Sequence, residues 1–482
     1  MEVKDLTPSL IWSLFDRITQ IPRPSKNEGK IVAFLLDFAR EHQLEALKDE
    51  ALNVIIRKPA TPGMENRPVV ILQSHVDMVC EKNKDVNINF DTDPVETYID
   101  GDWVKARGTT LGADDGIGVA AALAILSSKD LQHGPLVALF TTDEETGLTG
   151  ANALNPNFLD GDILLNLDSE EWGEFCIGCA GGKNTIGTFA YRPEAAPKDY
   201  FWFDFAVSGL LGGHSGSDIH KELGNANQIL TRYLYALSQQ TPIALAKIDG
   251  GDKHNAIARE ASVLAGVPFA AKEQAIIVLN LLQADILNEL PEEDKNVKLS
   301  IHSTETPANV IDNETVVKLI RTLYALPHGV MGWSFAISGL VETSTNLAAI
   351  KMKEGNTIAI TTSQRSSTAS AKDNTVNKVR AVFELAGAEV KSSDGYPGWK
   401  PNPNSPVLHT SEQVFEGLFG EKPKIISIHA GLECGLFSEK NPKLDMISCG
   451  PTILGAHSPE ERIEISTVEK WWRFLTELLK SI

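Results

Sequence analysis

The chain is poor in cysteine and has no long apolar run, and each shortage excludes a class of proteins. Its 482 residues include five cysteines. This sparse, odd set favours a reducing compartment over a disulfide scaffold, so we expect buried or partly buried thiols. The longest apolar run, residues 117–126, is shorter than the about 20 residues that a membrane-spanning helix needs.

Positive charge is also scarce. The chain has 44 Lys and Arg against 64 Asp and Glu, a net charge of -20. Because no stretch is dense in Lys and Arg, we expect no nucleic-acid partner and no membrane partner. Small substrates and metal cations suit this balance better. The first residues, MEVKDLTPSLIWSLF, lack the basic segment and cleavage site of a signal peptide, so we expect a cytoplasmic protein.

Residues 1–184 alternate between helical and strand patterns. We expect Thr7 to cap a first helix with Pro8 as its first residue, and residues 28–42 follow a helical period. Compact apolar runs are typical of strands buried on both faces, and helices between them indicate an α/β sheet. The expected strands are residues 53–56, 69–72, 136–140 and 163–167, with a buried helix over residues 116–128.

The middle of the chain has a different pattern. Over residues 185–395 the apolar runs are shorter and alternate more, which indicates an α+β insertion of two similar half-units. The expected strands are residues 201–207, 261–269, 299–301 and 357–362, and the expected helices are residues 226–238 and 314–326.

The α/β pattern returns at the end of the chain. Residues 388–404 are rich in turn formers and are interpreted as a return linker. A short strand follows at residues 445–448, and Ser466 and Glu469 form a capping box for the last helix. We therefore predict a catalytic domain of residues 1–184 and 396–482, interrupted by a lid domain of residues 185–395.

Polar motifs follow the predicted core strands directly. In an open α/β sheet, ligands bind beyond the carboxyl ends of the strands. The strand at residues 69–72 leads into His75 and Asp77, where an imidazole can bind metal while the carboxylate orients it. Another strand ends at Asp168. His457 lies in a loop after the strand at residues 445–448, where a lone histidine is more often a surface residue.

Two acidic motifs have both a structural and a functional interpretation. Asp114 and Asp115 precede the buried helix, and one of them would suffice as a helix cap. A second carboxylate there favours a bound cation. Residues 143–145 are three consecutive carboxylates after a strand, either a solvated turn or a site. In a site, Glu145 binds metal and Glu144 takes a proton from a metal-bound water.

The combination favours a metal centre. Two histidines and three carboxylates at one sheet edge suit a pair of divalent cations, zinc first, with manganese or cobalt as alternatives. The sequence therefore predicts a two-metal hydrolase with these ligands: His75, Asp114, Glu145, Asp168 and His457.

These motifs resemble the di-zinc exopeptidase family that includes carboxypeptidase G, aminoacylase, tripeptidase T and the carnosinases. The set SHVD, GADDG, DEETG, LDSE and GAHS spans both ends of the chain. GGHSG, GLVETSTNLA and HAGLECG are similar to its Xaa-His dipeptidase (aminoacyl-histidine dipeptidase) branch. The resemblance covers essentially the whole chain and implies a mixed-sheet α/β catalytic domain with an inserted α+β lid.

The resemblance also implies a role for each residue of the metal centre. Asp114 would bridge two metal ions and precede a cis peptide bond, Glu144 would be the general base, and Asp77 would orient the first histidine. One ion would be held by His75, Asp114 and Asp168, and the other by Asp114, Glu145 and His457.

Three lid residues are implied as substrate ligands. His214 would bind the scissile carbonyl oxygen or the substrate carboxylate, and Arg365 would clamp that carboxylate. Asn255 resembles a lid asparagine near the substrate, but the proline that follows it in the family is missing here.

Three functions remain open at this point. The resemblance implies a dipeptidase with a preference for Xaa-His, including β-Ala-His, in which a metal-bridged hydroxide attacks the peptide bond. An N-acyl-amino-acid deacylase would use the same metals and base. A non-catalytic metal-binding scaffold is the third alternative. Simple members of the family form homodimers through the lid, so a homodimer is a further expectation.

Overall fold

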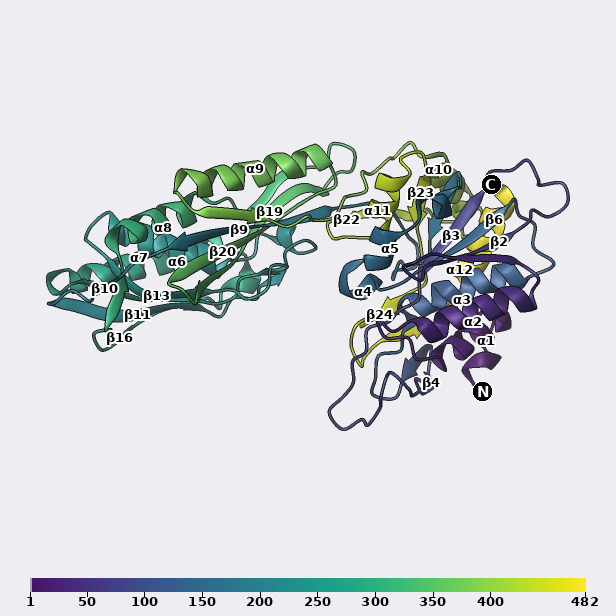
Figure 1. Cartoon of the computed structure of the whole chain (residues 1–482), viewed down its shortest axis with the longest axis horizontal. Helices are drawn as coiled ribbons and strands as arrows, with labels where there is room; N and C mark the ends of the chain where they lie inside the picture. Colours follow the sequence, from purple (N-terminus) through teal and green to yellow (C-terminus); the bar gives the residue numbers. More distant parts are fainter. Residues whose placement is uncertain (1) are drawn as a thin grey trace. The chain divides into compact units, whose positions relative to one another are not determined.

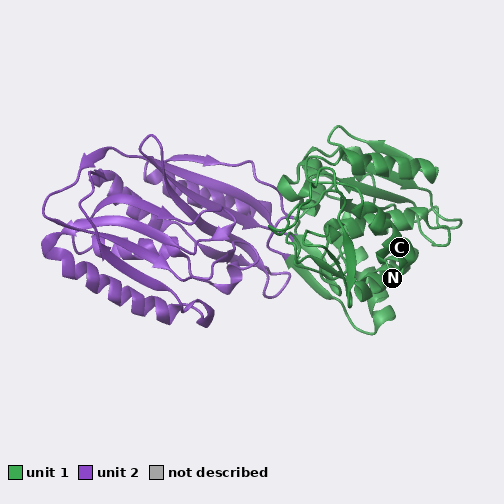
Figure 2. Ribbon diagram, turned by 90° about the horizontal axis from the view of Figure 1, so that it is seen from below, with its two compact units in different colours: residues 1–178, 399–427, 432–482 green, residues 179–398, 428–431 purple. Residues whose placement is uncertain are grey.

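The structure is a computed structural model that describes residues 2–482. Two compact units divide the chain (Figure 2). Unit 1 consists of Met1–Gly178, Trp399–Ser427 and Leu432–Ile482, and unit 2 of Cys179–Gly398 and Ile428–Gly431. These boundaries differ by a few residues from the predicted domain limits, and no sequence pattern indicated that residues 428–431 belong to unit 2.

Unit 1 is built on an eight-stranded mixed sheet with the order β1-β2-β6-β3-β7-β23-β8-β22. Its central strands β6, β3, β7 and β23 are mutually parallel. The predicted α/β class is confirmed. The strands are β1 (Glu45–Lys48), β2 (Val54–Lys58), β3 (Val70–His75), β6 (Leu136–Thr141), β7 (Ile163–Asn166), β8 (Glu174–Cys179), β22 (Lys424–Ile428) and β23 (Asp445–Ser448).

Helices pack around this sheet (Figure 1). Helix α3 (Ala113–Ser127) packs on β3 and against α1, and 14 of its residues are buried. A small second sheet has the order β24-β25-β5-β4, with β4 (Thr97–Asp100), β5 (Trp103–Ala106), β24 (Ile453–Leu454) and β25 (Arg462–Glu464). The other helices of at least eight residues are α1 (Ser9–Thr19), α2 (Gly29–Glu41), α10 (Pro406–Phe419), α11 (Glu433–Lys440) and α12 (Ile465–Ser481).

Two predicted helix starts are wrong. Helix α1 begins at Ser9 with Pro8 as its N-cap, so Thr7 does not cap it. Helix α12 begins at Ile465, because strand β25 leads directly into it and Glu464 is the N-cap. The hydroxyl of Ser466 therefore donates to the Glu464 carboxylate rather than forming the expected capping box.

Unit 2 contains a nine-stranded sheet with the order β16-β11-β15-β13-β19-β20-β9-β21, and β18 pairs with β19. One hydrophobic core cluster joins this sheet to four helices, which therefore lie on the same face. The strands are β9 (Gly181–Ala190), β11 (Tyr200–Ser208), β13 (Ala244–Gly250), β15 (Ala261–Pro268), β16 (Lys298–Ser303), β18 (Gly329–Trp333), β19 (Val341–Lys353), β20 (Thr357–Ser366) and β21 (Glu389–Ser392). The helices are α6 (Ala226–Ser238), α7 (Lys272–Glu289), α8 (Asn313–Ala325) and α9 (Ala369–Leu385).

The sheet of unit 2 joins two similar β-α-β-β-α-β half-units. One runs β11-α6-β13-β15-α7-β16, and the other β9-α8-β19-β20-α9-β21. When the four strands of each half-unit are numbered in chain order, both half-units have the strand order 4-1-3-2 from the outer edge of the sheet inward. The two half-units meet where β13 pairs with β19. The first half-unit is inserted into the second between β9 and α8. The predicted return linker is partly wrong, because residues 389–392 form the edge strand β21.

Candidate active site

Polar side chains gather where the parallel strands of unit 1 end. Strand β3 ends at His75, β6 leads into the short helix α4 (Glu144–Gly147), and Asp168 follows β7. Because β3, β6 and β7 are parallel neighbours, their carboxyl ends lie at one edge of the sheet. Sequence alone predicted this edge as the site.

Asp114 lies between the two predicted histidine ligands. Its Oδ1 atom is 3.0 Å from Nε2 of His75, and its Oδ2 atom is 3.0 Å from Nε2 of His457. The peptide bond from Asp114 to Asp115 is cis, which agrees with the resemblance. One carboxylate therefore faces both imidazoles, as a shared ligand must.

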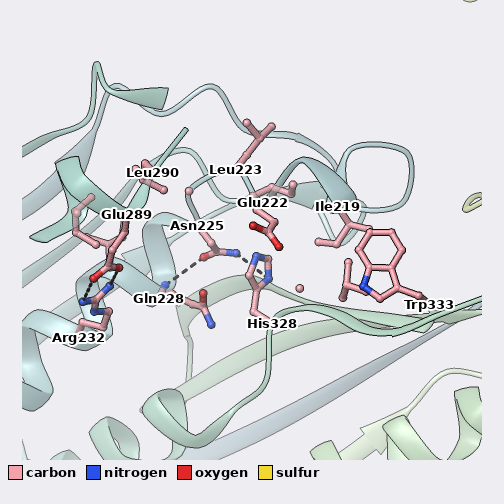
Figure 3. A pocket seen from close by; sticks show the side chains of 16 residues that line it. Ile219, Glu222, Leu223, Asn225, Gln228, Arg232, Glu289, Leu290, His328 and Trp333 are labelled. Carbon is pink, nitrogen blue, oxygen red and sulfur yellow. Dashed lines mark hydrogen bonds and ion pairs between the residues drawn. The ribbon is translucent and has the colours of Figure 1, made fainter. Parts of the chain in front are cut away.

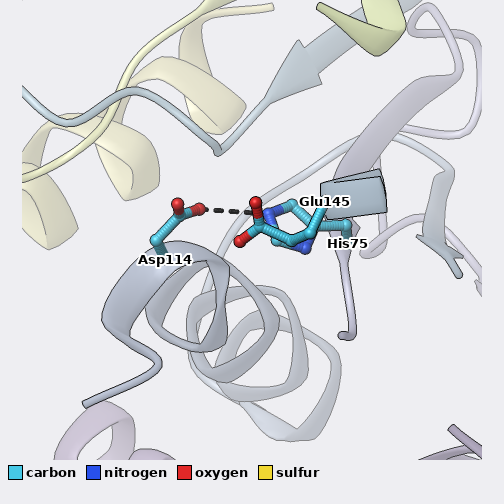
Figure 4. A group of neighbouring side chains, drawn as sticks. All are labelled: His75, Asp114 and Glu145. Atoms are coloured by element: carbon cyan, nitrogen blue, oxygen red, sulfur yellow. Dashed lines mark hydrogen bonds and ion pairs between the residues drawn. The ribbon is translucent and has the colours of Figure 1, made fainter. Parts of the chain in front are cut away.

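The remaining two predicted ligands complete two groups around Asp114. Asp168 Oδ1 is 3.5 Å from Nε2 of His75, and Glu145 Oε2 is 3.1 Å from Nε2 of His457. Atoms of His75, Asp114 and Glu145 lie within 4.8 Å of one another (Figure 4). The structure thus brings all five predicted ligands together, although their binding of metal stays a prediction.

The charges of this cluster fit bound cations. Asp114, Glu145 and Asp168 have side chains exposed by 9%, 4% and 10%. Within residues 2–482, none of them forms an ion pair with a lysine or an arginine. Glu145 Oε1 is also buried without a hydrogen-bond partner. Three buried negative charges are costly unless positive charge lies close to them. Divalent metal ions, which bind imidazole nitrogen and carboxylate oxygen atoms, would provide that positive charge.

Glu144 stands beside this cluster with an altered acidity. Its pKa is raised to about 8, mainly by burial; the charge of His75 opposes this rise, and neighbouring carboxylates add to it. Its backbone N–H donates to Asp77 Oδ1 at 3.0 Å. A carboxylate with its pKa near neutrality suits proton transfer, and a nearby metal ion would lower this pKa again.

Asp77 connects the first histidine to the acidic turn. Its carboxylate is 3.4 Å from Nδ1 of His75 and accepts hydrogen bonds from the N–H groups of Glu144 and Glu145 and from the Ser25 hydroxyl. Burial alone would raise its pKa, but these partners hold the pKa at about 2. Asp77 therefore stays ionised and orients both motifs.

Two buried charged residues that the sequence did not reveal hold the loop before Asp114. Glu461 accepts hydrogen bonds from four consecutive backbone N–H groups, those of residues 111–114, at 2.7–3.3 Å. Arg23 donates to the carbonyl oxygens of Val76, Asp77 and Gly112. Together they fix the backbone that presents the Asp114 carboxylate.

A third unpredicted residue, Glu433, lies beneath the sheet edge. It is 1% exposed, and its Oε2 atom accepts from Gln73 Nε2 and from the Thr141 hydroxyl, at 2.6 and 2.7 Å. Gln73 Oε1 in turn accepts from Asn166. This network ties together the ends of β3, β6 and β7, which carry the candidate ligands.

In unit 2, the structure places His214 and Asn255 next to each other. His214 lies on β12 (Gly213–His214) and pairs with Ala256 of β14 (Ala256–Ile257). Its Nδ1 accepts from the backbone N–H of Ser217, which leaves the proton on Nε2. The Asn255 carbonyl accepts from Ser215 N, but the Asn255 side chain has no hydrogen bond within the described residues. Its role near the substrate stays a prediction.

Arg365 lies at the end of β20 in a pocket of about 80 Å³, with His254 and Tyr396. It is 6% exposed, and one guanidinium nitrogen donates to the Tyr396 hydroxyl at 2.9 Å. Burial lowers the pKa values of three neighbouring histidines, and the charge of Arg365 is the second largest cause in each case. They are His214, His254 and His429. A guanidinium held in this way can bind a carboxylate through two hydrogen bonds.

His429 also lies close enough to Arg365 to feel its charge. The sequence assigned no role to His429, although its HAGLECG motif was recognised. It is 7% exposed, and its Nε2 atom lies 2.7 Å from the Ser344 hydroxyl. Burial, followed by the charge of Arg365, lowers its pKa to about 3. His429 is therefore neutral at pH 7.

A pH-dependent loss of stability follows from His429. The unfolded chain protonates this imidazole near its usual pKa of about 6.5, whereas the folded chain does so only near 3. Stability is therefore complete above about pH 6.5 and falls as the pH drops through that window. We expect His429→Gln to remove up to about 2–3 kcal/mol of the decrease between pH 7 and pH 4.5. Urea unfolding at both pH values measures the free energy of unfolding of the wild-type protein and of the variant. An equal decrease between pH 7 and pH 4.5 in the two proteins would contradict the prediction.

The comparisons with known proteins identify the chain as a peptidase. The model of peptidase family M20/M25/M40 matches residues 71–481, and the chain belongs to this family. It is 43% identical to the cytosol non-specific dipeptidase of Escherichia coli (strain K12), over 100% of this chain and 99% of the relative.

Solved structures share this fold. The aminoacylhistidine dipeptidase of Vibrio alginolyticus is 42% identical, with a TM-score of 0.95 over 100% of this chain and 98% of that one. A tripeptidase from Staphylococcus aureus shares the fold at 17% identity and a TM-score of 0.56, over 98% of each chain. No helix within residues 2–482 is long and apolar enough to cross a membrane.

Proposed function

We propose that this chain is a cytoplasmic metallo-dipeptidase that uses two divalent metal ions, zinc first, with manganese or cobalt as alternatives. The observation that carries the proposal is Asp114, whose two carboxylate oxygens each lie 3.0 Å from a different histidine. His75 and Asp168 would hold one ion, Glu145 and His457 the other, and Asp114 both. The full-length similarity to two dipeptidases supports this reading.

Glu144 is the proposed proton carrier. When bound, the metal ions supply the Lewis acidity that lowers the pKa of a water and polarises the peptide carbonyl. Glu144 accepts a proton from the attacking water at a carboxylate oxygen. It then gives this proton to the nitrogen of the scissile bond as that nitrogen leaves. Asp77 keeps the His75 ring and the Glu144 backbone in place during both transfers.

Residues of unit 2 are proposed to bind the ends of the substrate. His214 presents an Nε2–H that can donate to the scissile carbonyl oxygen, where negative charge develops. Arg365 clamps the C-terminal carboxylate, and Tyr396 holds its guanidinium. Asn255 is proposed to lie near the substrate as well. Unit 2 would thus act as a lid, within one chain or across a homodimer.

Replacing Arg365 by lysine tests the carboxylate clamp. Lysine keeps the charge but lacks the planar fork, so we expect KM for dipeptides to rise about tenfold with a smaller change in kcat. The matched comparison is a dipeptide with an amidated C-terminus, which has no carboxylate to lose. Equal effects of Arg365→Lys on the free and the amidated dipeptide would show that Arg365 contacts another group.

A substrate panel tests the whole proposal. The metal-depleted protein is assayed with Ala-His, β-Ala-His, Ala-Ala and N-acetyl-alanine, before and after addition of zinc, manganese or cobalt. We expect hydrolysis of dipeptides only with metal, and faster hydrolysis when histidine is the second residue. Equal rates for Ala-His and Ala-Ala would remove the Xaa-His preference. Hydrolysis of N-acetyl-alanine alone would favour the deacylase, and no hydrolysis with metal bound would favour the scaffold.

A further inference from the structure

Unit 2 contains a further pocket, larger than the one at Arg365, that the proposed mechanism does not use. Its volume is about 420 Å³, within the range of small-molecule sites. It is lined by the loop before α6, the first turns of α6, the end of α7 and residues of β18 (Figure 3). The pocket combines one fixed donor, one unpaired carboxylate and an apolar wall.

The fixed donor is the imidazole of His328. Its Nδ1 atom accepts hydrogen bonds from Leu347 N at 3.3 Å and from Asn225 Nδ2 at 3.4 Å. A backbone N–H can only donate, so the imidazole proton must be on Nε2. Burial lowers the pKa of His328 to about 4, which keeps the ring neutral. Nε2–H has no partner within residues 2–482, and an unsatisfied donor in a pocket favours a ligand that accepts.

The unpaired carboxylate is that of Glu222. This exposed side chain has no ion-pair or hydrogen-bond partner in the described part of the chain, and it points into the pocket in Figure 3. The nearby cations are already engaged, because Arg232 pairs with Glu289 and Lys221 pairs with Asp218. The pocket therefore holds one negative charge without compensation.

The wall between these polar groups is apolar. Ile219 and Val330 contribute aliphatic surface, and Trp333 adds an indole that is 48% exposed. The side-chain amide of Gln228 also lines the pocket and makes no hydrogen bond within residues 2–482. A ligand that satisfies every group carries a cation, an acceptor and an apolar body.

We propose that this pocket binds a free α-amino acid with an apolar side chain. The α-ammonium group pairs with Glu222, and the α-carboxylate accepts from His328 Nε2–H and from the Gln228 amide. The side chain packs on Ile219, Val330 and Trp333. The inference rests on the proposed function only for the source of the ligand, because a dipeptidase releases amino acids of this kind.

The site also adjoins the loop that carries His214. Ile219 and Glu222 follow His214 in the same loop, and Asp218 Oδ2 accepts from the backbone N–H of His214 at 2.8 Å. An amino acid held by Glu222 and Ile219 therefore restrains the segment that positions His214. We expect L-leucine to change kcat at saturating dipeptide through this loop.

Calorimetric titration of the full-length Glu144→Gln protein with L-leucine tests the site without turnover. We expect saturable binding that weakens about tenfold or more when the ammonium is blocked in N-acetyl-L-leucine or the carboxylate in L-leucinamide. Glu222→Gln should weaken L-leucine to a similar extent. Glu305→Gln, the same change at an exposed residue of unit 2 outside the pocket, should not. Trp333→Ala should weaken the binding of L-leucine more than the binding of glycine, which has no side chain to pack on the indole.

Three outcomes would overturn the proposal. They are an absence of saturable binding at millimolar L-leucine, equal binding of L-leucine and N-acetyl-L-leucine, and unchanged binding after Glu222→Gln, which would place the ligand elsewhere. Binding that depends on Glu222 in a protein without dipeptidase activity would leave the site intact and remove only the source of its ligand. If bound L-leucine leaves kcat unchanged, the expected effect on His214 is contradicted, but the binding site itself still stands.

Discussion

Replacing Glu144 by glutamine should lower kcat by about 10²–10⁴-fold while both metal ions remain bound. Glutamine has the same shape but cannot accept the proton of the attacking water. Its backbone N–H still donates to Asp77, so the turn that carries Glu145 keeps its position. Steady-state kinetics and metal analysis of the same preparation measure the two quantities.

The neighbouring residue provides a matched control. Glu145→Gln makes the same chemical change one residue further on, where the carboxylate lies 3.1 Å from His457. We expect this variant to lose metal as well as activity, because a neutral amide is a weaker ligand. If Glu144→Gln retains nearly full turnover, or if it also loses metal, the division of roles between the two glutamates is wrong.

Replacing Glu461 by glutamine should have the second largest effect, although Glu461 is not a proposed ligand. Its two carboxylate oxygens accept from the N–H groups of residues 111–114, and an amide offers only one acceptor oxygen to these four donors. The backbone before Asp114 loses its fixed position. We expect metal affinity to fall by about 10–100-fold, as for other partners that orient metal ligands.

A chelator competition titration measures this change in affinity. Glu460→Gln is the matched control, since Glu460 is adjacent but exposed, and within residues 2–482 its side chain forms no hydrogen bond or ion pair. The melting temperature of the metal-free protein should also fall for Glu461→Gln, because unsatisfied buried N–H groups cost free energy without any metal. Wild-type affinity in Glu461→Gln would show that the loop holds its shape by other means.

The sequence predicted those parts of the site that depend on strand direction. His75, Glu145 and Asp168 each follow a continuous apolar run, and such runs indicate parallel strands that end at one edge. His457 was the weakest of these predictions, because its loop has no local pattern of its own and only its combination with the other motifs favoured it. The structure brings it to 3.0 Å from Asp114.

Residues that act through burial could not be predicted in this way. Arg23 and Glu461 lie in loops with the composition of a solvated surface, yet they are only 1% and 2% exposed. Their role depends on backbone groups distant in the sequence that converge only on folding. Tyr396 was missed for the same reason, since its contact with Arg365 joins a turn to a strand end.

The position of β23 in the sheet has a consequence for how the protein is made. This strand lies between β7 and β8, although nearly 280 residues separate it from β7 along the chain. While the ribosome is still extending the chain, β7 is an open edge that can pair with other nascent chains. The sheet of unit 2 ends with β21, so it can form before β23 has been synthesised. We therefore expect truncation before residue 445 to give a protein whose unit 2 is folded but which aggregates through β7.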